Sequence, residues 1–254
     1  MKVITFFAEK GGMGKSTLTA MMASWLAYEK KERVMALDFD YPNHQLYGFR
    51  QNDLAELKSN EKYRQMCGEN IPFPLHKVDF LAKDPAKKVV LLENIRGLLE
   101  GDGYCLMDFP GRFLPDDPAA ILAFNGVVDY MVLLADSDAQ SRASAMFVYA
   151  QLNSDSFLKY SGKRTGQDMC LLWNRETHNE RRGNRDWYGP AERKFADIGL
   201  EVCPVKIRDI PITRREAGVF GFVRNTLCWP AQNVSRACPY MVDIFEYILE
   251  RCGR

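Results

Sequence analysis

A glycine-rich run near the N-terminus has the residue types and the spacing needed for phosphate chemistry. It reads Lys10-Gly11-Gly12-Met13-Gly14-Lys15-Ser16-Thr17. An apolar stretch, 3–8, precedes the run and a helix-like stretch, 18–28, follows it, which is the strand, loop and helix order of a phosphate-binding loop. Glycines let backbone N–H groups approach phosphate oxygens, Lys15 can reach the β- and γ-phosphates, and the Ser16 hydroxyl can bind Mg²⁺.

The run departs from the common phosphate loop at its start. Glu9 stands where that loop usually has its first glycine, and an extra lysine, Lys10, opens the run. A chance match to the rest of the pattern in a chain this long is rarer than about 1 in 1,000, given average residue usage. We therefore expect a nucleoside triphosphate and Mg²⁺ to bind here.

Two acidic segments end apolar runs farther along the chain. Asp38 and Asp40 close the run 34–37, and Asp108 closes the run 104–107. In open parallel sheets, ligands bind at the carboxyl ends of strands. Alternation along a strand sends Asp38 and Asp40 to one side, so that one can hold metal-bound water while the other orients the attacking water. Asp108 is placed as the second acidic contact to Mg²⁺, and the Pro-Gly turn after it can move with the γ-phosphate.

A polar pair, Asn174-Arg175, ends a third apolar run, 169–173. The amide of Asn174 has both a donor and an acceptor, which suits the edge of an adenine ring. Asparagine also caps turns, so a purely structural role is the alternative for this residue.

Together these segments resemble the ParA/MinD group of P-loop ATPases, whose deviant Walker A motif is written K-G-G-x-G-K-[ST]. Residues 10–16 fit that motif at every fixed position. The segment 38–42 resembles switch I of the group, and Asp108-Phe109-Pro110-Gly111 resembles its switch II. The resemblance spans residues 1 to about 222, and it is sharp over the first 42 residues.

The later segments match the group more loosely. Asn174-Arg175 resembles its N-R pair, and residues 207–217 resemble its adenine-side segment after a shift of one residue. On this resemblance we expect the nucleotide to contact a set of residues that runs through the loop and reaches the base: Gly11, Gly12, Met13, Gly14, Lys15, Ser16, Thr17, Asn174, Arg175 and Pro211. The metal would be held by Ser16, Asp38 and Asp108.

The resemblance also implies a mechanism, in which ATP and Mg²⁺ drive formation of a homodimer with the nucleotides held between the subunits. Lys10 would reach across to the partner's phosphates and neutralise charge that develops during transfer, as an arginine finger does. Lys15 would do the same within its own subunit, and Asp40 would position the attacking water. Hydrolysis would be slow and would act as a timer for the dimer.

The elements that must position these residues alternate along the chain. Strand-like runs lie at 3–8, 34–37, 104–107, 127–134, 169–173 and 200–205, and helical patterns lie at 16–31, 85–100, 117–125, 138–153, 188–198 and 236–251. This alternation predicts an α/β fold of the P-loop NTPase type, with a mostly parallel, doubly wound sheet and helices on both faces. We expect a single domain over 1–254.

Two stretches fit this scheme less well. Residues 41–84 are polar and turn-rich, with a helix expected near 51–66 and a short strand at 78–82. Residues 175–187 have the composition of an exposed, mobile loop.

Composition narrows the class of protein. The chain has 254 residues, a net charge of +1 and seven cysteines without a C-x-x-C pair. The near-zero charge provides no global attraction to nucleic acid or membranes, and the cysteine pattern disfavours a disulfide framework or a zinc ribbon. With no secretory leader or membrane span apparent, we expect a cytoplasmic protein.

The motifs leave the output of the ATPase open. The first hypothesis is DNA partition or positioning, with non-specific DNA contact, a small activating partner protein, and a basic patch among Arg181, Arg182, Arg185, Arg214, Arg215, Arg224 and Arg236. The alternatives are a MinD-like positioning ATPase and an ATP-dependent adaptor in conjugative DNA mobilisation. The C-terminal stretch 240–251 is amphipathic but acidic, so we expect it to pack as the last core helix, without stable membrane association.

Overall fold

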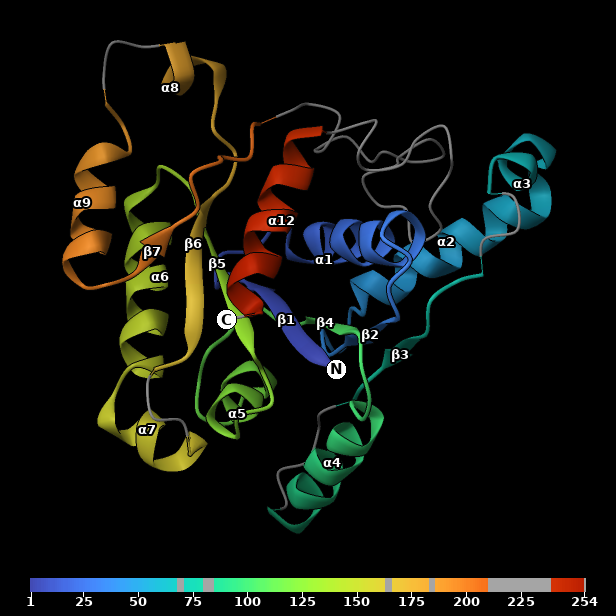
Figure 1. Ribbon diagram of the computed structural model, residues 1–254, viewed down its shortest axis with the longest axis horizontal. Coiled ribbons are helices and arrows are strands. Elements are labelled where there is room, and N and C mark those ends of the chain that lie inside the picture. Colours follow the sequence, from blue (N-terminus) through green and yellow to red (C-terminus); the bar gives the residue numbers. More distant parts are fainter. Residues whose placement is uncertain (68–70, 80–84, 163–165, 183–185, 210–238, 254) are drawn as a thin grey trace.

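The computed structural model describes residues 1–67, 71–79, 85–162, 166–182, 186–209 and 239–253 (Figure 1). These residues form one seven-stranded sheet, made of β1 (Lys2–Phe7), β2 (Val34–Asp38), β3 (Leu75–Lys77), β4 (Tyr104–Asp108), β5 (Tyr130–Ala135), β6 (Asp168–Trp173) and β7 (Glu201–Val202).

The strand order is β3-β2-β4-β1-β5-β6-β7, and every neighbouring pair is parallel. β1 is central, with Thr5 opposite Met107 of β4 and Phe7 opposite Leu133 of β5. The chain winds from β1 outward to one edge through β2 and β3, and to the other through β5, β6 and β7. The expected α/β, doubly wound sheet is confirmed, and the carboxyl ends of its strands meet at one edge.

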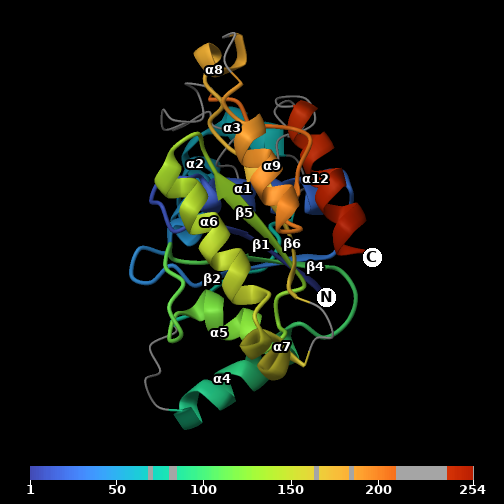
Figure 2. The ribbon, with the colours of Figure 1, turned by 90° about the vertical axis from the view of Figure 1, so that its left-hand side faces the viewer.

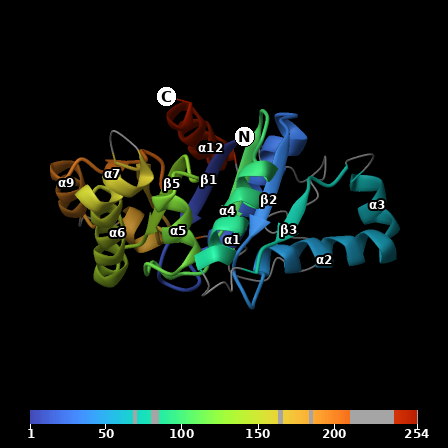
Figure 3. The same ribbon diagram turned by 90° about the horizontal axis from the view of Figure 1, so that it is seen from below.

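Helices cover both faces of the sheet, as Figures 2 and 3 show. They are α1 (Lys15–Ser24) continued by a π-helical turn (Trp25–Glu29), α2 (Gln45–Ser59), α3 (Glu61–Cys67), α4 (Pro85–Leu98), α5 (Pro118–Phe124), α6 (Ala139–Leu152), α7 (Asp155–Ser161), α8 (His178–Arg182), α9 (Gly189–Asp197) and α12 (Pro239–Cys252). Two apolar cores result because side chains alternate along each strand. Ile4 and Phe6 enter the core under α1 and α12, whereas Val3 and Phe7 enter the opposite core under α5, α6 and α9.

The C-terminal helix α12 belongs to the first of these cores. Met241, Ile244, Phe245 and Ile248 are at most 2% exposed, and the Phe245 ring lies 5.5 Å from that of Trp25. The prediction that this amphipathic stretch packs as a core helix is thereby confirmed. In the described part of the chain, no helix is both long and apolar enough to cross a bilayer.

The polar, turn-rich region 41–84 differs from the sequence prediction in two places. The helix expected at 51–66 is two helices, because Asn60 leaves the helical conformation and its Oδ1 accepts a hydrogen bond from the Tyr63 N–H, which caps α3. The strand expected at 78–82 does not begin there: residues 78 and 79 are not in a strand, and the edge strand β3 comes earlier, at Leu75–Lys77, while residues 80–82 lie outside the described residues.

The stretch 175–187, expected to be a loop, contains the short helix α8, which has no buried residue. The helix α7 was not predicted. Ser154 begins it by accepting a hydrogen bond from the Phe157 N–H, and the buried Phe157 ring anchors it against Phe124. Seven residues are too few for a helical period to stand out in a sequence.

Candidate functional site

The phosphate loop connects β1 to α1 at the carboxyl edge of the sheet. Gly12 and Gly14 have φ angles of +72° and +81°, a left-handed conformation that favours glycine. Met13 lies between them with its side chain fully buried. The Leu18 N–H donates to the Gly14 carbonyl at 2.9 Å and starts the first turn of α1. The loop thus curves over a helix N-terminus, where backbone N–H groups and the helix dipole favour an anion.

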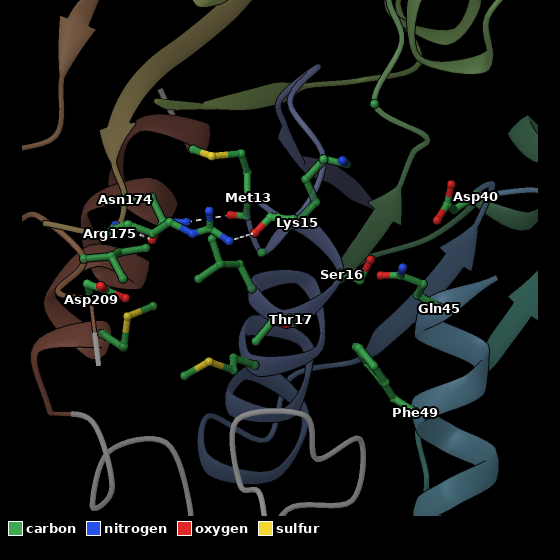
Figure 4. A pocket seen from close by; sticks show the side chains of 18 of the residues that line it. Met13, Lys15, Ser16, Thr17, Asp40, Gln45, Phe49, Asn174, Arg175 and Asp209 are labelled. Atoms are coloured by element: carbon green, nitrogen blue, oxygen red, sulfur yellow. Dashed lines mark hydrogen bonds between the residues drawn. The ribbon is translucent and has the colours of Figure 1, made fainter. Parts of the chain in front are cut away.

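A cavity of about 890 Å³ opens beside this loop. Residues 11–17, Asp40 and Gly111 line it, and Asn174 and Arg175 lie on its side next to β6 (Figure 4). Its volume lies within the range of about 300–1,000 Å³ that is typical of small-molecule sites. The cavity can therefore hold a nucleotide whose phosphates contact the loop.

Asn174 and Arg175 contact the phosphate loop directly. The Asn174 Nδ2 donates to the Met13 carbonyl at 2.5 Å, and the Arg175 guanidinium donates to the Gly12 carbonyl, as the dashed lines in Figure 4 show. The Asn174 Oδ1 accepts from the Arg175 N–H at 2.8 Å. The amide expected to recognise adenine is thus also bonded to the loop.

Lys15 lies half-buried at the loop, facing the switch II segment. Burial lowers its pKa, whereas the charges of Asp108 and Asp40 raise it. A Cβ atom added to Gly111 would lie 2.7 Å from the Glu9 carbonyl oxygen and 3.2 Å from the Lys15 Nζ. Only glycine allows switch II to approach the phosphate loop this closely.

Asp108 is fully buried beside Ser16 and does not line the cavity. Neither of its carboxylate oxygens has a hydrogen bond of normal geometry. Burial raises its pKa to about 7, the nearby Ser16 side chain lowers it, and the charge of Asp38 raises it further. A buried carboxylate without partners is costly, and two carboxylate oxygens beside a hydroxyl are the hard donors that Mg²⁺ prefers. The residues present therefore fit a magnesium ion.

Asp38 holds the start of switch I in place. Its Oδ1 accepts from the Asp40 N–H at 3.0 Å, and its Oδ2 accepts from the Tyr47 N–H at 2.9 Å. His44 lies next to it, with the imidazole Nδ1 at 3.5 Å from the Asp38 Oδ1. These contacts turn Asp40 toward the cavity, where burial and then the charge of Asp38 raise its pKa, while Lys15 lowers it.

Lys10 points away from the cavity. Its Nζ lies 2.8 Å from the Asp136 Oδ2 and 3.1 Å from the Asp138 Oδ2, in the turn between β5 and α6. The hydrogen bond to Asp136 is the main cause of its raised pKa. In this conformation the lysine is paired within its own subunit.

An aromatic contact that was not predicted joins the two switch segments. The Phe39 and Phe109 rings are buried with their centroids 5.0 Å apart, and the Phe39 N–H donates to the Asp108 carbonyl at 2.8 Å. Each ring lies next to an acid of the site. The sequence signal was the repeated Asp-Phe at the ends of two strands.

Most of the predicted site residues are brought together here. Residues 11–17, Asp40, Asn174 and Arg175 line the cavity, whereas Asp38, Asp108 and Lys10 do not. Pro211 lies outside the described residues, so its place at the base stays a prediction.

Helix α2 provides cavity residues that were missed. Gln45, Phe49 and Asn52 face the cavity from its side, and Figure 4 shows Gln45 near Ser16. Their spacing of four and three residues is that of one helix face. The signal was present, but the predicted helix started six residues too late to reveal it.

The proposed basic patch is only partly described. Arg181 and Arg182 are exposed on α8. The other candidates, Arg185, Arg214, Arg215, Arg224 and Arg236, lie outside the described residues, so the patch stays a prediction.

Known proteins are similar to this chain in part of its sequence and in its fold. Residues 1–68 match a family described as AAA domain, and no curated protein is significantly similar in sequence. Solved structures match over nearly the whole chain. The ATP complex of a McdA variant from Cyanothece is 18% identical, with a TM-score of 0.66 and coverage of 100% of this chain and 96% of its own.

Two further structures are similar at the same level. A ParA family ATPase from Chlorobium tepidum is 16% identical, with a TM-score of 0.59 and coverage of 98% and 97%. MinD in the MinC:MinD complex from Aquifex aeolicus is 17% identical, with a TM-score of 0.59 and coverage of 98% and 96%. The chain thus has the fold of the ParA and MinD ATPases that its motifs resemble, and its residues 1–68 are similar to the family described as AAA domain.

Proposed function

We propose that the chain is a ParA-like ATPase in which ATP and Mg²⁺ drive a homodimer and slow hydrolysis ends it, for DNA partition or positioning. The observation that carries the ATPase proposal is the buried Asp108 carboxylate, unpartnered beside Ser16 at a preformed phosphate loop. A buried aspartate with a purely structural role would accept hydrogen bonds from neighbouring groups. Asp108 lies where a bound metal ion and its water molecules would supply the partners that its carboxylate lacks.

Different residues of the chain bind the nucleotide, hold the metal and orient the water. The loop's N–H groups and Lys15 bind the triphosphate, and Ser16, Asp38 and Asp108 would hold Mg²⁺. The metal supplies charge neutralisation on the phosphate oxygens when it is bound. Asp40 faces the cavity and orients the attacking water. Lys10 must leave Asp136 and Asp138 before it can reach the phosphates of a partner subunit.

DNA partition or positioning is the output that we favour. The exposed Arg181 and Arg182 support contact with DNA phosphates. The buried apolar face of α12 leaves that helix without the free face that membrane binding requires. A small protein that activates hydrolysis remains part of the proposal.

Nucleotide titration tests the proposal. Calorimetry with ATP and Mg²⁺ should show binding, and light scattering should show a dimer with ATP but not with ADP. Lys15→Ala should abolish both, because it removes the ammonium that faces the phosphates. Lys2→Ala, which changes an exposed lysine of β1, is the matched control. Wild-type protein that binds no ATP would refute the ATPase, and ATP binding without dimers would refute only the switch. Gel shifts with plasmid DNA at two salt concentrations test whether the ATP-bound protein binds DNA.

A further inference from the structure

The loop carbonyls at Gly12 and Met13 are held by side chains that follow β6, two strands away from β1 at the same edge of the sheet. The Asn174 amide donates to the Met13 carbonyl at 2.5 Å, and the Arg175 guanidinium donates to the Gly12 carbonyl. From these contacts we infer that Asn174 and Arg175 are positioning residues, which keep the loop shaped for phosphate before a nucleotide binds. This inference rests on the proposed nucleotide site, and assigns the pair a role separate from recognising the base.

The two hydrogen bonds act on the part of the loop that matters for anion binding. A loop that alternates right- and left-handed residues turns successive N–H groups into one concavity. Gly12 and Gly14 adopt the left-handed conformation here, with Met13 between them. Fixing the carbonyls of Gly12 and Met13 fixes the peptide planes that carry the N–H groups of the next residues, because each peptide unit is rigid.

The support for these hydrogen bonds is itself rigid. Asn174 is 7% exposed, and its N–H donates to the Ala135 carbonyl at 2.7 Å, which ties it to β5. Arg175 has a φ of +63°, an uncommon conformation for a residue with a side chain. Its N–H donates to the Asn174 Oδ1, and the Glu176 N–H donates to the Ile207 carbonyl at 2.9 Å. The strained residue is thus held on both sides, which directs its guanidinium to the loop.

The glycines match this arrangement. A Cβ atom at Gly12 would lie 3.4 Å from the Arg175 Nη2, and one at Gly14 would lie 3.6 Å from the Asn174 Nδ2. Both are ordinary contact distances, so the side chains pack directly against the glycine backbone. The need for glycine comes from the positive φ, and the two side chains stabilise that conformation from behind.

A ligand without a base separates positioning from base recognition. Inorganic tripolyphosphate with Mg²⁺ contacts the loop but has no adenine. We expect Asn174→Ala to weaken tripolyphosphate and ATP binding by the same factor of about ten, the size of one lost buried hydrogen bond. Arg175→Ala should weaken both by a smaller, again equal factor, because its hydrogen bond is exposed. The preference for ATP over GTP should stay unchanged in both variants.

Controls keep the outcomes distinct. Arg193→Ala removes an exposed arginine of α9 and should leave all affinities unchanged. Arg175→Lys should restore little tripolyphosphate affinity, because lysine keeps the charge but lacks the planar donor group. Melting temperatures show whether Asn174→Ala is folded, and Arg175→Ala tests the inference independently if it is not. Unchanged tripolyphosphate binding in both alanine variants, with the preference for ATP over GTP lost, would overturn the positioning role. Wild-type protein that binds neither ligand would refute the nucleotide site itself.

Discussion

The buried carboxyl of Asp108 makes the stability of the nucleotide-free protein depend on pH. Its pKa is about 7 in the folded protein, against an ordinary value of 3.8, chiefly because burial disfavours the charged form. Between these two values the folded protein holds a proton that the unfolded chain releases. The free energy of unfolding therefore falls as the pH rises through this window, and this contribution levels off above the folded pKa.

The size of the effect follows from the shift. Each unit of pKa corresponds to about 1.4 kcal/mol, so the shift of Asp108 costs up to about 4 kcal/mol once its carboxyl is ionised. Asp108→Asn replaces the acid with a neutral side chain of nearly the same shape. We expect the variant to be more stable than the wild type above about pH 7, with a difference that shrinks toward about pH 4.

Urea unfolding at a series of pH values, without nucleotide, measures this difference. Titrating groups that do not interact with Asp108 cancel when the two curves are subtracted, so the difference reports Asp108 together with the charges that act on it, Asp38, Asp40 and Lys15. Asp116→Asn, which removes an exposed acid paired with Lys88, is the control and should not reproduce the trend. Parallel curves for wild type and Asp108→Asn would refute the raised pKa. The same substitution should weaken binding of ATP with Mg²⁺, because an amide is a poorer magnesium ligand than a carboxylate.

Three other substitutions test the switch. Asp136→Asn should increase the fraction of ATP-bound dimer measured by light scattering, because it weakens the ion pair that retains Lys10 within its own subunit. An unchanged dimer fraction would contradict this role of the ion pair. Asp40→Ala should bind ATP but hydrolyse it at least about tenfold more slowly, and wild-type phosphate release would remove Asp40 from the reaction. Phe109→Leu should lower the ratio of ATP to ADP affinity by breaking the ring contact with Phe39, whereas equal loss for both nucleotides would mean that the contact is only structural.

The phosphate side of the site was predictable because its chemistry is local in sequence. The run 10–17 carries its own glycines, lysine and hydroxyl, and the loop forms between the strand and the helix that its flanks predict. Asp40 and Asp108 were found because apolar runs end at acids, and parallel strands bring such ends to one edge. The doubly wound order followed from the same alternation.

What the sequence left out depends on contacts between distant segments. No local pattern shows that Asn174 bonds to Met13, or that Lys10 pairs with Asp136, because each pair is separated by more than 120 residues. The edge strand β3 was misplaced since three residues carry too little periodicity to fix a strand.

The two lysines of the loop are held with different strength, and this difference suits them to different tasks. Lys15 is half-buried and stays at the site, where burial and two acids act on it in opposite directions. Lys10 keeps 37% of its side chain exposed, so its ion pair with Asp136 contributes at most about 1 kcal/mol. A triphosphate on a partner subunit would offer more charge than that pair does. In the proposed mechanism the nucleotide therefore takes Lys10 from its own acids without unfolding anything, and the contact forms only when two loaded subunits meet.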